Sequence, residues 1–197
     1  MPPMRCGLAL ALVTAFAAQD PVADPGKQLT LELRVFHGTA EVTAQSRATL
    51  HRAGDRGEPL MHASSADGRI QVRLTPGIYD VQAIHEREGR VLNIRWANRL
   101  VLMPYPDELG HHLEVINFSN GFGALQIREA AGGRPDAALY EVGNRDKPTA
   151  AAVATPTYLV FVVRAGLYDL LTRVSGKPTW NAGIDVPLDR TRLWVIP

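Results

Sequence analysis

Short segments with an apolar residue at every second position run along most of the chain. In the first of them, residues 29–35, leucine and valine alternate with Thr30, Glu32 and Arg34. This period-two pattern is typical of a β-strand that buries one face and exposes the other. Many short strands between Gly- and Pro-rich turns predict an all-β sandwich architecture. Further strands are predicted at residues 48–52, 70–74, 78–84, 91–96, 100–103, 113–118, 125–128, 137–142, 158–163, 167–174 and 192–196.

An internal repeat organises these strands. Residues 48–59 (ATLHRAGDRGEP) return as residues 137–148 (AALYEVGNRDKP). The GIYD segment at 77–80 returns as GLYD at 166–169. Both blocks match at an offset of 89, and two blocks in one register indicate a duplicated β unit.

The repeat predicts two tandem antiparallel β-sandwich domains, at residues 29–118 and 123–197. Domains of this size are only marginally stable alone, so we expect the two to pack on each other. In one strand the second copy carries Val160 and Val162 where the first copy has polar residues. A strand with two apolar faces needs cover on both sides. We therefore expect these valines to pack against the first domain or to bind a partner.

The N-terminus has the pattern of a secretory signal peptide. Arg5 precedes a short apolar stretch at residues 8–16, and a small-x-small site follows, so we expect cleavage of residues 1–17. The alternative, a membrane anchor, is disfavoured because the apolar stretch is too short to cross a bilayer. Residues 18–28, rich in Pro and Asp, predict an extended leader. We expect a periplasmic or secreted protein with no membrane span in the mature chain.

Cleavage changes the composition that matters for function. It removes Cys6, the only cysteine, and Arg5, which leaves 20 Lys and Arg residues against 20 Asp and Glu. The mature chain then has no disulfide and no thiol for catalysis or metal binding. A formal charge near zero provides no basic footprint for nucleic acid, which we exclude as a partner.

The sequence contains no strong catalytic motif. It lacks H-E-x-x-H, G-x-S-x-G and a Gly-rich phosphate loop, so we predict neither an enzyme nor a cofactor. Tyr79 and Tyr168 are in register with the apolar residues of their strands, which predicts inward-facing core anchors. Asp80 and Asp169 then point outward, where hydrogen bonds to the adjacent turns explain them best.

Two residue groups remain as candidate sites. His111, His112 and Glu114 combine imidazoles with a carboxylate and are a plausible partial Zn²⁺ set, although a solvated loop is the simpler interpretation. Arg95, Trp96 and Arg99 form the second group, an aromatic residue between two arginines. Tyr105 lies between these two groups, in the nine residues by which the first copy exceeds the second.

A tryptophan flanked by polar groups is a stacking platform for sugars or peptides. Arg95, Trp96 and Arg99 fit this description. Trp96 equally fits a core position whose exposed side is covered by arginine stems. The two interpretations differ in whether loss of the ring abolishes binding or folding.

The turn motifs resemble a known family. Residues 73–81 (RLTPGIYDV) and 163–170 (VRAGLYDL) resemble the L-x-P-G-x-Y-x-V signature of carboxypeptidase-regulatory-like (transthyretin-like) β-sandwich modules, with Ala165 where proline is usual. Residues 132–139 and 180–186 resemble two further segments of the same family. The resemblance covers most of both halves and implies antiparallel sandwiches that serve as non-catalytic accessory, adhesive or ligand-binding units of exported proteins.

These observations together predict an exported, non-enzymatic binding or adaptor module. We expect it to recognise a protein partner in the cell envelope through edge-strand pairing or loop contacts. One alternative is a carbohydrate-binding accessory protein that holds a glycan on Trp96 and Tyr105. A less favoured alternative is a metal site at His111 and His112.

Overall fold

The computed structural model describes residues 28–104 and 111–197 of the 197-residue chain. The predicted signal peptide, nearly all of the predicted leader and Tyr105 lie outside these described residues. Within them the chain forms fifteen β-strands and a single 3-10 turn, η1 (Thr43–Gln45), which confirms the predicted all-β class. No helix of the described part has the length and hydropathy that a bilayer span requires.

The first half folds into two facing sheets. One sheet has the order β2-β1-β5, with β8 also paired to β1, and the other has the order β4-β3-β6-β7. Their strands are β1 (Leu29–His37), β2 (Ala40–Glu41), β3 (Ser46–Arg52), β4 (Met61–Ser64), β5 (Ile70–Leu74), β6 (Gly77–Arg87), β7 (Arg90–Leu102) and β8 (His111–Asn117).

The second half repeats this plan with seven strands. One sheet has the order β11-β12-β9-β15 and the other has the order β10-β13-β14. Their strands are β9 (Phe122–Glu129), β10 (Asp136–Glu141), β11 (Val153–Ala154), β12 (Leu159–Arg164), β13 (Gly166–Val174), β14 (Lys177–Val186) and β15 (Thr191–Ile196). The two tandem sandwiches are therefore present, whereas the residue limits of the two domains stay a prediction.

One pairing in each half departs from a purely antiparallel order. The last strand of each sandwich runs parallel to the first, so that β8 pairs with β1 and β15 pairs with β9. The other strand pairs are antiparallel. The same parallel pair at the same place in both halves supports the duplication that the sequence repeat indicates.

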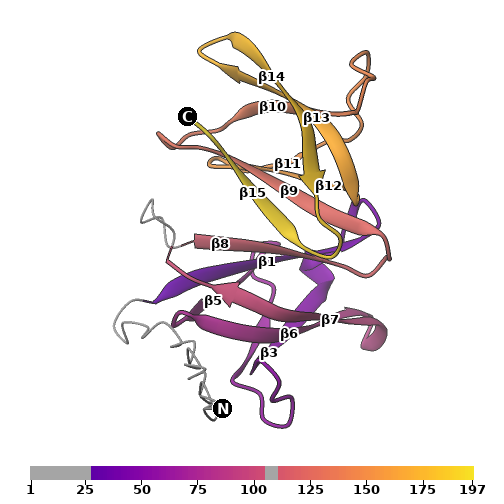
Figure 1. Cartoon of the computed structure of the whole chain (residues 1–197). Coiled ribbons are helices and arrows are strands. Elements are labelled where there is room, and N and C mark those ends of the chain that lie inside the picture. Colours follow the sequence, from indigo (N-terminus) through magenta and orange to yellow (C-terminus); the bar gives the residue numbers. More distant parts are fainter. Residues whose placement is uncertain (1–27, 105–110) are drawn as a thin grey trace, which may run out of the picture.

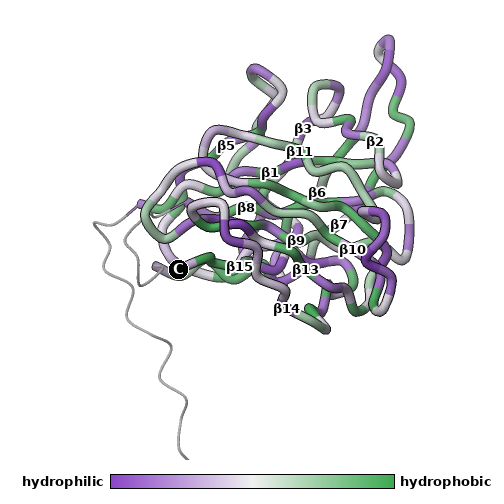
Figure 2. The backbone as a smooth tube through the Cα atoms, turned by 90° about the horizontal axis from the view of Figure 1, so that it is seen from above, coloured by the Kyte–Doolittle hydropathy of each residue, from purple (hydrophilic) through white to green (hydrophobic). Residues whose placement is uncertain are grey.

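Each sandwich has its own apolar core. Leu50 and Leu139, which correspond in the sequence repeat, are both fully buried, as are Val81 and Leu170. Each buried side chain of this size stabilises the fold by roughly 1.5–3 kcal/mol. In Figure 2 the hydrophobic stretches follow the strands through the middle of the molecule, whereas hydrophilic stretches gather in the turns.

A third apolar cluster joins the two sandwiches. Val160 and Val162 are 0% and 5% exposed and lie in a cluster with Phe36 of β1 and Leu113 and Val115 of β8. Figure 1 shows the consequence, four stacked sheets in which β1 and β8 lie next to β9, β12 and β15. The two inner sheets are covered on both faces, which explains why β12 is apolar on both sides.

Candidate functional site

The outer face of the first sandwich carries a buried carboxylate that fixes two loops. Asp80 on β6 is 3% exposed. Its oxygens accept the backbone N–H of Arg99 at 2.8 Å and that of Gly54 at 3.2 Å, and Oδ2 lies 3.5 Å from Arg56 Nε. Burial alone raises the pKa of Asp80, but these donors lower it below its ordinary value. Asp80 is therefore an ionised structural anchor, as the sequence predicts.

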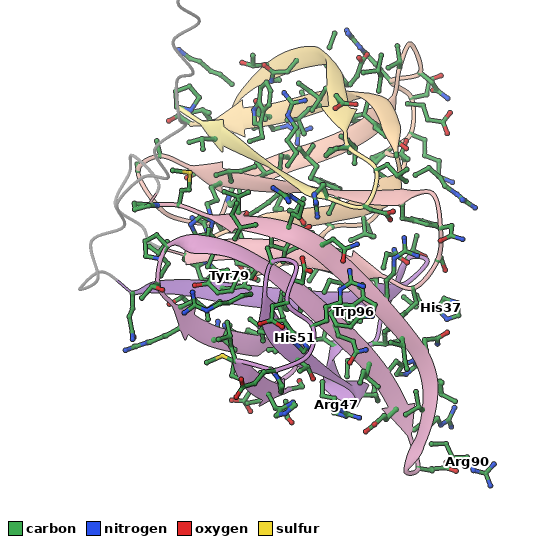
Figure 3. All side chains as sticks on the ribbon, turned by 60° about the horizontal axis from the view of Figure 1, so that its bottom comes forward. His37, Arg47, His51, Tyr79, Arg90 and Trp96 are labelled. Carbon is green, nitrogen blue, oxygen red and sulfur yellow. The ribbon has the colours of Figure 1, made fainter. Side chains whose placement is uncertain are left out.

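Arg56 connects this anchor to Trp96. The Arg56 Cζ atom lies 4.3 Å from the Trp96 ring centroid, which is a cation–π contact. The His51 ring lies 5.4 Å from the same indole, and Figure 3 shows both rings on one face of the sheet. Arg56 Nη2 also donates to Asn98 Oδ1 at 2.5 Å. Trp96 is thus half-buried, with the guanidinium over one ring face.

The second sandwich contains the same cluster. Arg145 lies 4.3 Å above Trp180, and Arg145 Nε donates to Asp169 Oδ2 at 3.2 Å. Tyr140 takes the place of His51, with ring centroids 5.0 Å apart. We call these two clusters the Trp–Arg–Asp clamps. Their occurrence in both halves indicates a structural role, because an arginine contacts a tryptophan and a buried aspartate in each.

Sequence reasoning missed Arg56, Arg145 and Trp180. The two arginines lie inside the repeated block and could have been found by asking what a repeated charged residue contacts. The two tryptophans were harder to recognise as equivalent, because they do not match at the offset of 89 that relates the repeated blocks. Trp96 is paired with Gln82 and Trp180 with Leu171, equivalent positions of the two long hairpins that differ in length.

The structure does not bring Arg95, Trp96 and Arg99 together on one surface. The Arg95 guanidinium points to the second sandwich, where Nη2 donates to Asp189 Oδ1 at 2.6 Å and Nη1 donates to Asn120 Oδ1 at 2.8 Å. Arg99 contributes its backbone N–H to the clamp and has a positive φ of 54°. Adjacent strand residues point to opposite faces, which separates Arg95 from Trp96.

The three candidate metal ligands also have separate partners. His111 Nε2 lies 3.0 Å from Glu32 Oε2, whereas Glu114 Oε1 accepts the backbone N–H of Thr191 at 3.0 Å. His112 is buried on β8, one residue from His111 and so directed to the other face of the strand. The described residues contain no group of three His, Cys, Asp or Glu side chains that could hold a metal ion.

Glu114 instead links the two sandwiches. Besides Thr191 N–H, it accepts the Thr191 hydroxyl at 3.3 Å, and that hydroxyl accepts the backbone N–H of Val115 at 2.8 Å. Burial raises the pKa of Glu114 to about 8, against the opposing effects of Arg190 and of the Thr191 donors. Arg190 Nη2 also donates to the carbonyl oxygen of Asn98 at 2.6 Å.

A buried polar cluster lies beside the apolar junction. Glu32 is 1% exposed and accepts hydrogen bonds from Tyr158 Oη at 2.5 Å, Arg34 Nε at 3.0 Å and Gln71 Nε2 at 3.2 Å, in addition to the contact with His111. Burial alone raises the pKa of Glu32, but these partners lower it to about 2. Burial and the Glu32 carboxylate raise the pKa of Tyr158.

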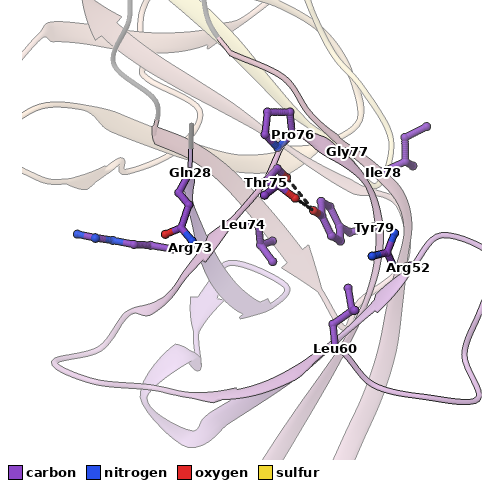
Figure 4. Close-up of a pocket in the computed structure, with 10 residues that line it drawn as sticks. All are labelled: Gln28, Arg52, Leu60, Arg73, Leu74, Thr75, Pro76, Gly77, Ile78 and Tyr79. Atoms are coloured by element: carbon purple, nitrogen blue, oxygen red, sulfur yellow. Dashed lines mark hydrogen bonds between the residues drawn. The ribbon is translucent and has the colours of Figure 1, made fainter. Parts of the chain in front are cut away.

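A cavity of about 300 Å³ opens where β5 turns into β6 (Figure 4). The Tyr79 ring forms part of its wall, and the Tyr79 hydroxyl donates to the carbonyl oxygen of Thr75 at 2.7 Å. Tyr168 makes the same bond to the carbonyl oxygen of Arg164 at 2.8 Å. Both tyrosines are also buried at 7% and 8% exposure, as expected for core anchors.

Strand β7 forms an exposed edge. It spans thirteen residues and pairs with β6 on one side, and it ends the sheet order on the other. Val91, Leu92 and Ile94 are 50%, 50% and 56% exposed. The turn to β6 uses Glu88 and Gly89, both with positive φ, which is the pattern of a tight hairpin. Figure 3 shows Arg90 at the far end of this hairpin.

The sequence matches no protein-family model and no curated protein. Among solved structures it is similar to the Bacillus anthracis TIE protein, with 14% identity, a TM-score of 0.33, and coverage of 86% of this chain and 33% of that one. It is similar to a DUF3823 family protein from Parabacteroides merdae, with 10% identity, a TM-score of 0.29 and coverage of 81% and 98%. It is also similar to CBMbc, of family CBM26, from Eubacterium rectale Amy13K in complex with maltoheptaose, with 12% identity, a TM-score of 0.26 and coverage of 85% and 91%.

The chain thus spans about a third of the TIE protein. Similarities with TM-scores this low do not indicate a function for this chain. The resemblance to carboxypeptidase-regulatory-like modules stays a prediction from its turn motifs.

Proposed function

We propose that this chain is an exported, non-enzymatic binding module that docks a protein partner of the cell envelope on the edge of strand β7. The observation that carries the proposal is the row of exposed apolar side chains, Val91, Leu92 and Ile94, on a thirteen-residue edge strand. Edge strands of this length with apolar side chains are templates for a further strand, and monomeric proteins usually blunt them. A partner would add an extended segment by main-chain hydrogen bonds and bury these side chains.

The equivalent edge of the second sandwich supports this choice by contrast. Strand β14 begins with Lys177 and Pro178, and a charged residue and a proline both oppose strand addition. Trp180, further along β14, is covered by Arg145 in the second clamp. Strand β7 also begins with a charged residue, Arg90, but contains no proline. The two edges are therefore unequal, and β7 is the one suited to a partner.

A crosslinking pull-down with the tagged chain tests the proposal. The double substitution Leu92→Lys and Ile94→Lys places two charges on the edge and should abolish recovery of the partner. Leu188→Lys is the matched control, because Leu188 is 56% exposed in the second half. Circular dichroism and thermal unfolding of all variants confirm that each is folded. Equal recovery of the partner by the β7 variant and the control would contradict the proposal.

Export forms part of the same proposal. The N-terminal pattern predicts that the mature chain begins at Ala18. N-terminal sequencing of the chain recovered from the periplasm or medium of a bacterial host tests this directly. Recovery of an uncleaved chain in the cytoplasm would contradict it.

Carbohydrate binding on Trp96 is the second candidate. The half-exposed indole beside polar side chains favours it, but Arg56 covers one face of the ring. A sugar stacked on that face would have to displace the guanidinium from both Trp96 and Asp80. A pull-down with cell-wall and plant polysaccharides decides between the two functions. Retention of the wild-type chain and its loss in Trp96→Ala would favour the glycan.

A further inference from the structure

A pocket of about 390 Å³ lies at the junction of the two sandwiches. Its wall combines Arg69 from the first sandwich with Arg128, Thr157 and Tyr158 from the second. We propose that this pocket binds a small monocarboxylate with a short apolar tail, and that Arg128 and Arg69 hold the carboxylate. This site is independent of the β7 edge, and its volume lies in the range typical of small-molecule pockets.

The central observation is that Arg128 is buried without a carboxylate partner. Arg128 is 5% exposed. Its Nη2 atom donates to His111 Nδ1 at 2.7 Å and to the carbonyl oxygen of His111 at 2.9 Å. When the Gln126 side-chain amide is oriented with its oxygen toward Arg128, that oxygen accepts a hydrogen bond from Arg128 Nε at 2.9 Å. Among the described residues, no carboxylate oxygen lies within 4.0 Å of the Arg128 guanidinium.

The neighbouring Arg34 differs from Arg128 because it contacts carboxylates directly. It is equally buried, but Glu32 and Glu41 each place a carboxylate oxygen 3.0 Å from its guanidinium. A buried charge without a partner is costly, because desolvation is not offset by an opposite charge. An anion in the pocket would supply the missing partner for Arg128.

The polar cluster offers Arg128 a carboxylate only indirectly, through His111. Glu32 Oε1 is engaged by Tyr158 and Arg34, and Oε2 by His111 and Gln71. His111 accepts from Arg128 through Nδ1, so its proton is on Nε2 and points to Glu32. In this arrangement His111 is neutral and leaves the positive charge of Arg128 in place.

The other lining groups define the ligand. Glu32 and Glu129 also line the pocket. Both Glu32 oxygens already have partners, so two guanidiniums face one free carboxylate, and the site suits a single negative charge better than two. The planar fork of an arginine matches a carboxylate in bidentate geometry. Pro156 and the Tyr158 ring add an apolar wall for a short tail. A free short-chain acid and the C-terminal carboxylate of a peptide both present this chemistry.

Titration of the ¹⁵N-labelled chain with butyrate and benzoate tests the site. We expect a saturable shift of the Arg128 Nε–Hε resonance with a Kd on the order of 1 mM, and a smaller effect from butyramide. A short peptide with a free C-terminus, compared with its amidated form, distinguishes the two sources of the carboxylate. A shift produced equally by butyramide, or by sodium chloride at the same ionic strength, would overturn the proposal.

Substitution of Arg69, which is exposed, tests the site without disturbing the core. Arg69→Gln changes an exposed residue and should weaken butyrate binding by a factor of about two to five. Arg173→Gln removes a partly exposed arginine of β13, in the β10-β13-β14 sheet, none of whose strands lines the pocket, and should leave binding unchanged. Arg128→Gln removes that resonance, so its binding is followed through the backbone N–H resonances of Thr157 and Tyr158, which butyrate should no longer shift while far-UV circular dichroism remains native. Unchanged binding in both Arg69→Gln and Arg128→Gln would also overturn the proposal.

Discussion

Arg56 covers Trp96, with its Cζ atom 4.3 Å from the ring centroid, and the second sandwich repeats the contact at the same distance between Arg145 and Trp180. Each arginine also contacts a buried aspartate that holds two loops. The clamps therefore connect an exposed hairpin to the sheet beneath it. The position of Trp96 among polar groups at the surface is thus explained by the contribution of the clamp to stability.

The clamps predict that removal of either arginine lowers the free energy of unfolding by a similar amount. Arg56→Ala and Arg145→Ala should each lower the free energy of unfolding by about 1 kcal/mol, since each removes a cation–π contact and a partly exposed ion pair. Urea denaturation measures the change. Arg87→Ala is the control, because the Arg87 side chain is 75% exposed and should contribute little. If both clamp variants matched the wild type, the structural role of the clamps would be wrong.

Glu32 predicts a loss of stability in acid. Its folded pKa of about 2 lies below its ordinary value of 4.5, so its contribution is complete above pH 4.5 and is lost as the pH falls toward 2. Glu32→Gln should be less stable than the wild type by roughly 3 kcal/mol at pH 7, because buried Arg34 loses one of its two carboxylate partners. The difference should shrink between pH 4.5 and 2. Denaturation curves across this range test it, and a constant difference would contradict the assignment.

Glu114 predicts the opposite trend at higher pH. Its folded pKa of about 8 exceeds its ordinary value of 4.5, so the folded chain holds the proton over a range where the unfolded chain has lost it. Stability from this group is complete below pH 4.5 and declines as the pH rises through 8. Glu114→Gln should flatten the pH dependence of the free energy of unfolding between these values. An unchanged slope in the variant would mean that Glu114 titrates normally.

The apolar junction predicts that the two sandwiches stabilise each other. Val162→Lys places a charge in the third cluster and should lower the free energy of unfolding by roughly 2–3 kcal/mol. Calorimetry shows in addition whether the two halves then unfold in separate transitions. Val142→Lys is the matched control, because Val142 is 57% exposed. Unchanged stability of Val162→Lys would mean that the junction contributes little.

Strand positions and the duplication could be predicted because they depend on local patterns. The alternation in residues 29–35 and the repeated GIYD and GLYD segments specify strands and turns without reference to the rest of the chain. The apolar outer face of β12 even indicated that something covers Val160 and Val162. The parallel pairing of β8 with β1 could not be predicted in this way, because it depends on how the chain crosses between sheets.

The candidate sites were harder to predict, since they depend on contacts between distant residues. Arg95 and Trp96 are neighbours in sequence, yet strand alternation directs them to different partners. Glu32 and Tyr158 meet across 126 positions, and no spacing rule connects them. Sequence proximity therefore suggested sites that the fold separates, and it missed the polar cluster that the fold assembles.

The most direct test of the proposed function is site-specific photo-crosslinking from strand β7. A photoreactive amino acid is placed at Leu92, and in a parallel sample at Leu188, both of them exposed apolar positions. Docking on the β7 edge predicts one dominant crosslinked protein from Leu92 and none from Leu188. Crosslinks of equal yield from both positions, or none from Leu92 while the tagged chain still recovers a partner, would contradict docking on the β7 edge.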